Sequence, residues 1–527
     1  MIYHCEDHTC NYWDEGEKLP ERCPQCGRKL LRANEADMTG DDWTALGNTL
    51  WDAEASDKKR MVDCFRKAAY LGSAWGVCNL GICMEQGNGV EADPVQAFWL
   101  YQQAVEMGSL NAVCCLGVCY QYGIGTAPDA EKAAELYCKA AEYGSPRGQM
   151  LLARAFHDGI GVEADAAEAV HWVRAAAYQR YGEGMYRLGV CYEYGDGVEQ
   201  NWEHAVHWFR EAAESGVSVA MTDLGYCYEK GCGVEQSWEQ AFSWYRRSAE
   251  CGNPVSMSNL GLCYQMGYGV EQNWQEAIKW YEQGAQCGDL QSMHNLACCY
   301  EHGEGVEQNM TEAIRWYTAA AEGGNADDMY ELGWQYDHGE GVEQDMKKAI
   351  CWYERAAEQN HPAAMNSLGE CYAMGRGVPR DLETAMEWYR RAAELGEAMA
   401  DYNMGWHLEQ AGKLSEAYAH YRKAADGNDD SAWWALGRFY ENGVVVAQDG
   451  KEARRCYETG EKLGSVKCKM RLARCKLLGI GGRRAKKAGL DLCRQALELA
   501  KESSEKEDYG YEAEMNLLRR TIAENES

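Results

Sequence analysis

The sequence predicts an all-α protein, an α-solenoid of about 13 helix-turn-helix repeats that follows a short cysteine-rich segment. Three observations predict the solenoid: a leucine recurs every 36 residues over most of the 527-residue chain, both halves of each period carry a helical apolar stripe, and a glycine pair separates the halves. Self-similarity at a period of roughly 20 to 50 residues is the signature of stacked repeats. The leucine series, which includes one methionine, comprises Leu46, Leu80, Leu116, Leu152, Leu188, Leu224, Leu260, Leu296, Leu332, Leu368, Met404, Leu436 and Leu472.

Both halves of each period are predicted to be helices with one buried face. In the first half, apolar residues fall at −3, 0, +3 and +4 from the key leucine, which places them on one side of a helix. In the second half they follow the spacing i, i+3, i+4, i+7 and i+8, which has the same consequence. Examples are Met257, Leu260, Cys263 and Tyr264 for a first helix, and Ala205, Trp208, Phe209, Ala212 and Ala213 for a second helix.

The segment between the two helices has the chemistry of a tight turn. It reads GxGV, as at Gly195 and Gly197, and glycine tolerates the positive φ that ends a helix and turns the chain. An Asn, Asp or Ser follows, and its side-chain oxygen is expected to cap the second helix by accepting a hydrogen bond from a free backbone N–H. These capping residues are Asn201, Ser237, Asn273, Asn309, Asp345 and Asp381.

The full period reads LGxCYxxGxGVxxNxxxAxxWYxxAAExG at residues 188–216, 260–288, 296–324 and 368–396. It resembles the Sel-one-like repeat family, a relative of the tetratricopeptide repeat, and the resemblance covers about residues 40 to 500. The resemblance implies a right-handed superhelix that binds other proteins. Two periods depart from the pattern, because the one at Met404 has AGKLSEA in place of the glycine turn and the one at Leu472 lacks the Trp-Tyr pair. Irregular terminal repeats are expected of such arrays.

Residues 1–36 do not fit the repeat and contain four cysteines, Cys5, Cys10, Cys23 and Cys26. The second pair lies in CPQCG, a knuckle whose Pro and Gly shape a turn that directs two thiolates at one metal ion, in a segment too short to fold unaided. The segment resembles zinc-ribbon and rubredoxin-like modules, and we predict one structural zinc ion rather than a redox iron. Because the first knuckle is C-x4-C instead of C-x2-C, the choice of ligands among Cys5, His8 and Cys10 stays open.

The predicted organisation therefore has three parts: a zinc ribbon over residues 1–36, the repeat solenoid over residues 37–500, and a C-terminal capping helix within residues 501–527. The cap is indicated by the helical spacing of Met515, Leu518 and Ile522. The ribbon has two possible roles, a structural cap on the first repeat and a separate docking site. We favour the cap.

The positions of the 25 cysteines predict free thiols and a cytoplasmic protein. Eight of them share the +3 core position, and equivalent helices in a stack lie about 10 Å apart, beyond the roughly 7 Å between Cα atoms that a disulfide bridges. Some secreted members of the resembled family are stapled by disulfides between neighbouring repeats, a spacing that Cys251 and Cys287 do not keep. No apolar run approaches the ~20 residues of a membrane helix, and no signal-peptide pattern is present.

The formal charge of −31, from 83 acidic and 52 basic residues, argues against nucleic acid and anionic membranes as partners. Residues 465–490 are an exception, with nine Lys or Arg and no acid, and they form either a solvated end or a docking site for an acidic partner or another copy. A ladder of glutamates follows the turn valine, and we expect it to be a solvated edge rather than a basic-peptide track. The ladder comprises Glu163, Glu199, Glu235, Glu271, Glu307 and Glu343.

The predicted function is a protein-protein interaction scaffold without enzymatic activity. No nucleophile elbow, HExxH motif, phosphate-binding loop or dinucleotide-binding fingerprint is present. Stacked hairpins leave a concave face of first helices, which suits an extended basic or neutral segment of a partner protein. The residue at −1 flanks the apolar stripe and is an amide or acid in several repeats, so it either grips a partner's backbone or bonds to a neighbouring hairpin. The candidates are Asn79, Asp223, Asn259, Asn295 and Asn403.

Two functions from other classes remain as alternatives. Some members of the resembled family are linked to hydrolysis of cell-envelope or lactam compounds, but this chain lacks a recognisable nucleophile motif. The cysteine-rich segment also leaves open a metal-dependent electron carrier. A metal assay on purified protein separates this carrier from a zinc protein, because an iron-thiolate site is red and a zinc site is colourless.

Overall fold

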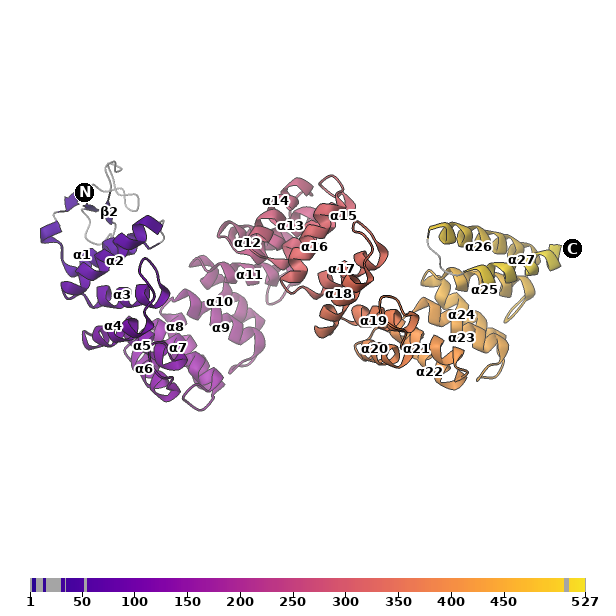
Figure 1. The fold of residues 1–527 in the computed structure, drawn as a ribbon, viewed down its shortest axis with the longest axis horizontal. Helices are drawn as coiled ribbons and strands as arrows, with labels where there is room; N and C mark the ends of the chain where they lie inside the picture. The colour runs from indigo at the N-terminus through magenta and orange to yellow at the C-terminus, as the bar shows by residue number, and fades with distance from the viewer. Residues whose placement is uncertain are drawn as a thin grey trace. The chain divides into compact units, whose positions relative to one another are not determined.

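The protein is described by a computed structural model that covers residues 2–5, 13–15, 30–33, 35–51, 55–506 and 511–526. Over these residues the chain forms 27 α-helices, one short 3-10 helix and three short strands. The α-solenoid of paired helices is thereby confirmed. The chain divides into two compact units, residues 1–277 and 278–527, and helix pairs follow one another through each unit (Figure 1).

The first unit begins with a three-stranded antiparallel sheet, followed by the 3-10 helix Glu35–Asp37. The strands are β1 (Ile2–Cys5), β2 (Trp13–Glu15) and β3 (Leu30–Ala33), in the order β2-β1-β3. The helices are α1 (Gly40–Thr49), α2 (Ala55–Tyr70), α3 (Ala74–Gln86), α4 (Pro94–Glu106), α5 (Leu110–Tyr122), α6 (Ala130–Glu142), α7 (Pro146–Asp158), α8 (Ala166–Tyr178), α9 (Gly182–Tyr194), α10 (Trp202–Glu214), α11 (Ser218–Lys230), α12 (Trp238–Glu250) and α13 (Pro254–Met266).

Helix α14 (Trp274–Gln286) contains the boundary, and the second unit continues with further pairs and one final single helix. Its helices are α15 (Leu290–His302), α16 (Met310–Glu322), α17 (Ala326–His338), α18 (Met346–Glu358), α19 (Pro362–Met374), α20 (Leu382–Glu394), α21 (Ala398–Gln410), α22 (Leu414–Asp426), α23 (Asp430–Asn442), α24 (Gly450–Lys462), α25 (Val466–Leu478), α26 (Lys486–Lys506) and α27 (Glu512–Glu526).

Where a pair has the glycine turn, the turn forms as its glycines predict. Gly195 ends α9 in the left-handed conformation, with φ of 75°, and its N–H donates to the carbonyl of Cys191 at 2.9 Å. Gly197, with φ of 67°, lies so close to the carbonyl of Ala166 at the start of α8 that a Cβ would overlap this oxygen. Asn201 then caps α10, because its Oδ1 accepts from the N–H of His204 at 3.0 Å. The turn of one repeat therefore packs on the second helix of the repeat before it.

The core of each pair is built around the key leucine and the residue after it. All 13 key residues are buried, with at most 8% of the residue exposed. The glycine that follows lies against an aromatic ring of the second helix: a Cβ on Gly225 would come within 2.6 Å of the Tyr245 ring. The same arrangement recurs at Gly47 and Phe65, Gly81 and Tyr101, Gly117 and Tyr137, Gly189 and Phe209, Gly333 and Tyr353, Gly369 and Tyr389, Gly405 and Tyr421, and Gly437 and Tyr457.

The buried tyrosine also explains a polar position five residues after the key leucine. Tyr245 donates its hydroxyl hydrogen to Glu229 on α11 at 2.8 Å, and Tyr101 donates to Glu85 at 2.6 Å. A buried hydroxyl needs such a partner, because an unpaired one costs about 1–3 kcal/mol. One side chain therefore closes the apolar core and bonds the two helices of a pair together.

The last single helix closes the second unit. Helix α27 packs against α25 and α26 (Figure 1), through a buried cluster that includes Met515, Leu518 and Ile522. Helix α26 extends to Lys506, so the repeat's second helix continues past residue 500, where the sequence places the start of the cap.

Candidate interaction face of the first helices

The polar residues predicted at −1 are half-buried at the flank of the first helices, on α3, α11, α13, α15 and α21. They do not form one continuous row. The intervening helices α5, α7 and α9 carry Cys115, Leu151 and Arg187 at the equivalent position. In the first unit only Asp223 and Asn259 occupy −1 in successive repeats.

Two of these asparagines bond to the neighbouring first helix. Asn79 Nδ2 donates to Oδ1 of Asn48 on α1 at 2.8 Å. Asn403 Nδ2 donates to Oδ1 of Asn366 on α19 at 3.0 Å and to Oε1 of Glu370 at 3.1 Å. These amides join consecutive repeats, which is the alternative that the sequence left open for this position.

The remaining three positions differ in their surroundings. Asp223 accepts a hydrogen bond from the hydroxyl of Tyr186 on α9, and burial raises the pKa of its carboxyl. Asn295 accepts from Nε2 of Gln291, one turn earlier on α15, at 3.0 Å. Asn259 is half-buried on α13. An acid, an amide bonded within its helix and a half-exposed amide thus occupy equivalent places.

A cavity of about 470 Å³ lies where the polar row is interrupted, between α7, α8 and α9. Its wall is apolar where Leu151, Val170 and Val190 line it, and arginines 147, 154 and 187 bring three positive charges to it. This cavity is not among the sites predicted from the sequence. The available signal was the arginine at −1 of α9, a basic residue at a position where six other repeats carry an amide or an acid.

Histidine and acid side chains complete the rim of the cavity. The His157 ring bonds to Asp158 Oδ1 through Nδ1 at 2.7 Å and to Asp196 Oδ2 through Nε2 at 3.2 Å. The hydrogen bond to Asp158 raises the pKa of His157, with the nearby Asp196 acting in the same direction. The rim therefore presents arginines beside carboxylates that already have a partner.

The two surface features predicted from charge have different outcomes. Every glutamate of the ladder is exposed, from Glu163 to Glu343. The basic stretch over residues 465–490 is not a simple charged end, because two of its arginines are half-buried and form ion pairs. Arg471 bonds both oxygens of Glu514 on α27 at 2.7 Å each, and Arg474 pairs with Glu441. No sequence pattern indicates these pairs, because the partners are 43 and 33 residues apart in the chain.

The predicted zinc ligands fall mostly outside the described residues. Cys10, Cys23, Cys26 and the alternative ligand His8 belong to segments that the structure does not describe, and Cys5 is the last residue of β1. Within the described ranges, no group of three or more His, Cys, Asp or Glu residues is placed to hold a metal ion. The ribbon and its metal stay a prediction.

Two further properties of the described residues bear on function. None of their helices combines the length and the apolar character needed to cross a bilayer. The 21 cysteines from Cys64 to Cys493 are free thiols.

Comparison with known proteins adds the following findings. The Sel1 repeat model matches eleven segments, at residues 76–109, 112–145, 146–181, 182–217, 218–253, 254–289, 290–325, 326–361, 362–397, 398–429 and 432–465. No curated protein matches the chain.

Two solved structures are similar over most of their own length. A protective antigen with an SLR fold from uropathogenic Escherichia coli, c5321, is 29% identical with a TM-score of 0.59, over 81% of this chain and 94% of that one. A Sel1 repeat protein from Oxalobacter formigenes is 31% identical with a TM-score of 0.43, over 46% of this chain and 96% of that one. The eleven matched segments cover the pairs from α3 to α24, so the first and last pairs fall outside the family pattern.

Proposed function

The chain belongs to the Sel1 repeat family, and from this premise we propose that it is a scaffold that binds a partner protein on the face formed by its first helices. Repeat proteins of this kind are typically non-enzymatic interaction scaffolds. The finer proposal is that an extended, basic or neutral segment of the partner lies along the concave side of the first helices. In this proposal the partner segment contacts the half-buried polar residues at −1 and the cavity beside α7 and α9.

The cavity is the single observation that carries this placement. Sites that bind a side chain or a small ligand are usually concave and mostly apolar, with a few convergent polar groups. The cavity has this composition, with Leu151 and Val190 on its wall and arginines at its edge. One apolar side chain of the partner would occupy it, and the arginines would bond to backbone carbonyls on either side.

The polar positions supply the remaining contacts of the proposed groove. An asparagine offers a donor and an acceptor, so it pairs with a peptide backbone without selecting its sequence. Asp223 and Glu331, both at −1, add negative charge, and the chain as a whole carries −31. Electrostatic complementarity therefore favours a basic or neutral segment.

The test compares partner capture by the full chain and three variants, measured by quantitative mass spectrometry. Val190→Trp fills the cavity, and Asn259→Ala with Asn295→Ala removes two polar positions. Glu271→Ala with Glu307→Ala alters only the exposed ladder and is the matched control. We expect the first two variants to lose the partners that the wild type and the control retain. Loss in the ladder variant alone would move the site to the solvated edge.

The N-terminal metal is a second proposal, because the strand pairing fits it. In the register of β1 and β3, Cys5 lies opposite Leu30, and Cys26 is four residues before Leu30. The sheet thus brings the backbone of one predicted ligand beside the strand that follows the knuckle. We propose that Cys5, Cys10, Cys23 and Cys26 hold one structural zinc ion, with His8 as the substitute for Cys5 or Cys10. Zinc supplies folding energy to such a segment.

The double variant Cys23→Ser with Cys26→Ser tests the zinc proposal. It should lose about one equivalent of metal and keep nearly all helical circular dichroism, because every α-helix in the described residues begins at Gly40 or later. An unchanged metal content would refute the proposal. Iron in place of zinc would support the electron carrier instead.

We also propose that the protein works in the cytoplasm. The 21 cysteines outside residues 1–36 are free thiols, and reducing compartments preserve such thiols. Thiol counting on denatured, non-reduced protein from its native source should find nearly all of them free. A ladder of native disulfides would contradict the assignment.

A further inference from the structure

One position of the first helices holds a fully buried acid in a single repeat. The residue four before the key leucine is small in eleven other repeats, because it faces the preceding helix pair: a Cβ on Gly148 would come within 2.6 Å of the Ala140 side chain. The first repeat carries Asp42 there, which is only partly buried and accepts a hydrogen bond from the N–H of Thr39 at 2.8 Å. In α17 this residue is Asp328, with 0% of its surface exposed. The small residues are Gly76, Ala112, Gly148, Gly184, Ala220, Ser256, Ser292, Ala364, Ala400, Ala432 and Cys468.

A neutral pair fills the equivalent place two repeats earlier. There, the hydroxyls of Thr222 on α11 and Ser256 on α13 lie 2.7 Å apart. In the later repeats, His294 Nδ1 on α15 and Asp328 Oδ1 on α17 lie at the same distance. Packing alone is therefore satisfied by two small hydroxyl residues. The charged pair places an acid in the interior, and Oδ2 of Asp328 has no hydrogen-bond partner.

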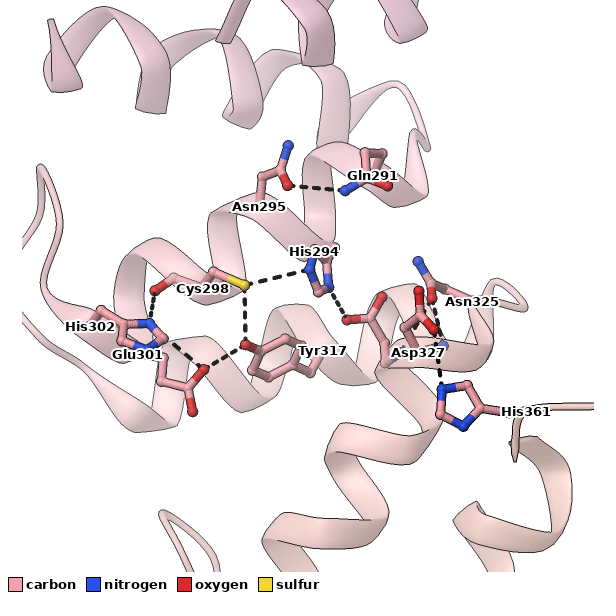
Figure 2. Close-up of polar contacts among 11 residues, drawn as sticks. Gln291, His294, Asn295, Cys298, Glu301, His302, Tyr317, Asn325, Asp327 and His361 are labelled. Carbon is pink, nitrogen blue, oxygen red and sulfur yellow. Dashed lines mark hydrogen bonds and ion pairs between the residues drawn. The ribbon is translucent and has the colours of Figure 1, made fainter. Parts of the chain in front are cut away.

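The second nitrogen of His294 faces a thiol. Cys298 is one turn further along α15, and its Sγ lies 3.6 Å from His294 Nε2 and 3.4 Å from the hydroxyl of Tyr317 on α16. Figure 2 shows the His294 ring beside the Cys298 sulfur, with the hydroxyl of Tyr317 below the sulfur. Tyr317 also donates to Glu301 at 2.6 Å. Acid, imidazole and thiol thus follow one another in the order that activates cysteine nucleophiles in other proteins.

We propose that Cys298, His294 and Asp328 form a nucleophilic thiolate site that is modified by small uncharged electrophiles, in particular hydroperoxides. Asp328 fixes the ring and stabilises its cationic form. His294 accepts the thiol proton and holds it as an imidazolium beside the sulfur. Its hydrogen bonds to Asp328 and then Cys298 raise the pKa of His294 to about 10. The side chain of His294 is 27% exposed, which gives a small reagent access to the pair.

The surrounding charges select the reagent. Glu301 and Glu331 are the acids that face the site from α15 and α17, and burial raises the pKa of Glu331. The carboxylate of Asp327 is paired with His361 at 3.2 Å. Negative charge around the sulfur disfavours anionic reagents, so a neutral hydroperoxide is favoured over an anionic disulfide such as glutathione disulfide.

The reaction with a hydroperoxide balances with the groups present. The thiolate sulfur attacks the terminal oxygen, the S–O bond forms and the O–O bond breaks. The departing alkoxide or hydroxide takes the proton from the His294 imidazolium and leaves as alcohol or water. The sulfur is oxidised by two electrons to a sulfenic acid, and the hydroperoxide is reduced.

The test measures alkylation of each cysteine in the full-length protein with iodoacetamide at pH 6.5, by mass spectrometry of peptides. An ordinary thiol is only about 1% ionised there, with its pKa near 8.5. Cys287 and Cys351 are exposed thiols of the same unit and serve as internal controls. We expect Cys298 to react at least about tenfold faster than both. A rate for Cys298 at or below that of the controls would overturn the proposal.

Two variants separate activation from exposure. The double variant His294→Thr with Asp328→Ser introduces the same two residues as the Thr222–Ser256 pair, so this packing already occurs in the chain. The single variant Asp328→Asn removes the charge and keeps the size of the side chain. Each should reduce the Cys298 rate about tenfold or more while leaving the Cys351 rate unchanged. Iodoacetate should label Cys298 more slowly than iodoacetamide does. The proposal of a nucleophilic thiolate would be refuted if both variants left the Cys298 labelling rate unchanged. It would also be refuted if dimedone trapped no sulfenic acid after one equivalent of hydrogen peroxide.

Discussion

The same glutamate position is used differently in the middle of the array and at its C-terminal end. Glu229 on α11 accepts from Tyr245 inside its own pair, and it also forms an ion pair with the neighbouring Lys230 at 2.7 Å. Glu441 on α23 accepts from Tyr457 at 2.8 Å and also pairs with Arg471 and Arg474. The first carboxylate joins two helices, whereas the second belongs to a buried network that reaches α27 through Glu514.

This difference shows that different contacts stabilise the middle of the array and its C-terminal end. A repeat in the middle has a similar repeat on each side, so complementary shapes of small residues and rings suffice. The pair of α25 and α26 packs instead against the single helix α27, and two hydrogen bonds between Arg471 and Glu514 join α27 to α25. Charge-assisted, bidentate bonds of this type fix the orientation of a single helix.

The largest effect is expected at the end of the array. Arg471→Ala leaves Glu514 buried without its partner, which costs about 3–5 kcal/mol. Hydrogen exchange of α27 and α25 is the suitable measurement, because a long repeat array does not unfold in one step. Exchange should rise sharply in these helices and stay unchanged in α11. The double variant Arg471→Met with Glu514→Leu should recover much of the protection; if it does not, the ion pair is not the cause.

A smaller effect is expected in the middle, where shape is decisive. Gly225→Ala places a methyl group against the Tyr245 ring, and overpacking of this kind costs about 1–3 kcal/mol. Hydrogen exchange of α11 and α12 should report it. Tyr226→Ala, at an exposed site on the same helix, should change exchange by less than about 0.5 kcal/mol. Equal effects of both substitutions would mean that the ring contact does not limit this position.

The hydroxyl of the buried tyrosine should contribute less than its ring. Tyr245→Phe keeps the ring and deletes the hydrogen bond to Glu229, which is worth about 0.5–1.5 kcal/mol. Tyr457→Phe should cost less than Tyr245→Phe, because Glu441 keeps two arginine partners when the hydroxyl is lost. Local hydrogen exchange of each pair measures both values. The reverse order would contradict the view that the end network satisfies Glu441 by itself.

The smallest effect is expected at the exposed ladder. Glu271→Gln with Glu307→Gln should change the midpoint of chemical unfolding by less than the equivalent of about 0.5 kcal/mol per site. Glu441→Gln, the same chemical change at a buried position, should have a clearly larger effect on α23 and α25. If the ladder variant and Glu441→Gln had similar effects on stability, the exposed and the buried glutamates would not differ as we expect.

The fold was predictable because its determinants are local and repeated. Gly195 ends a helix and Asn201 starts the next within seven residues, and the structure places both as predicted. The burial of the key leucines was predictable for the same reason. The glycine after the leucine was visible in the motif, but its cause was not, because the Tyr245 ring that occupies its space comes from the partner helix.

The site was less predictable because its contacts join distant residues with no shared period. Arg471 reads as part of a basic surface until Glu514, 43 residues later, is placed beside it. The cavity between α7 and α9 exists because the surrounding side chains leave a space unfilled. A pattern of residue types does not reveal such a space. His294 and Asp328 had a usable signal, since aligning the repeats from α3 onward with one another shows Asp328 as the one acid at a small-residue position.

The contact between a turn glycine and the preceding repeat has a consequence for how such a chain changes over generations. Gly197 lies on Ala166, Gly233 on Trp202 and Gly269 on Trp238, so each repeat presents the surface that the next one needs. An unequal recombination that adds or removes one whole period joins two surfaces that already match. The length of the array is therefore open to selection through duplication and deletion, without any new interface having to arise by point mutation.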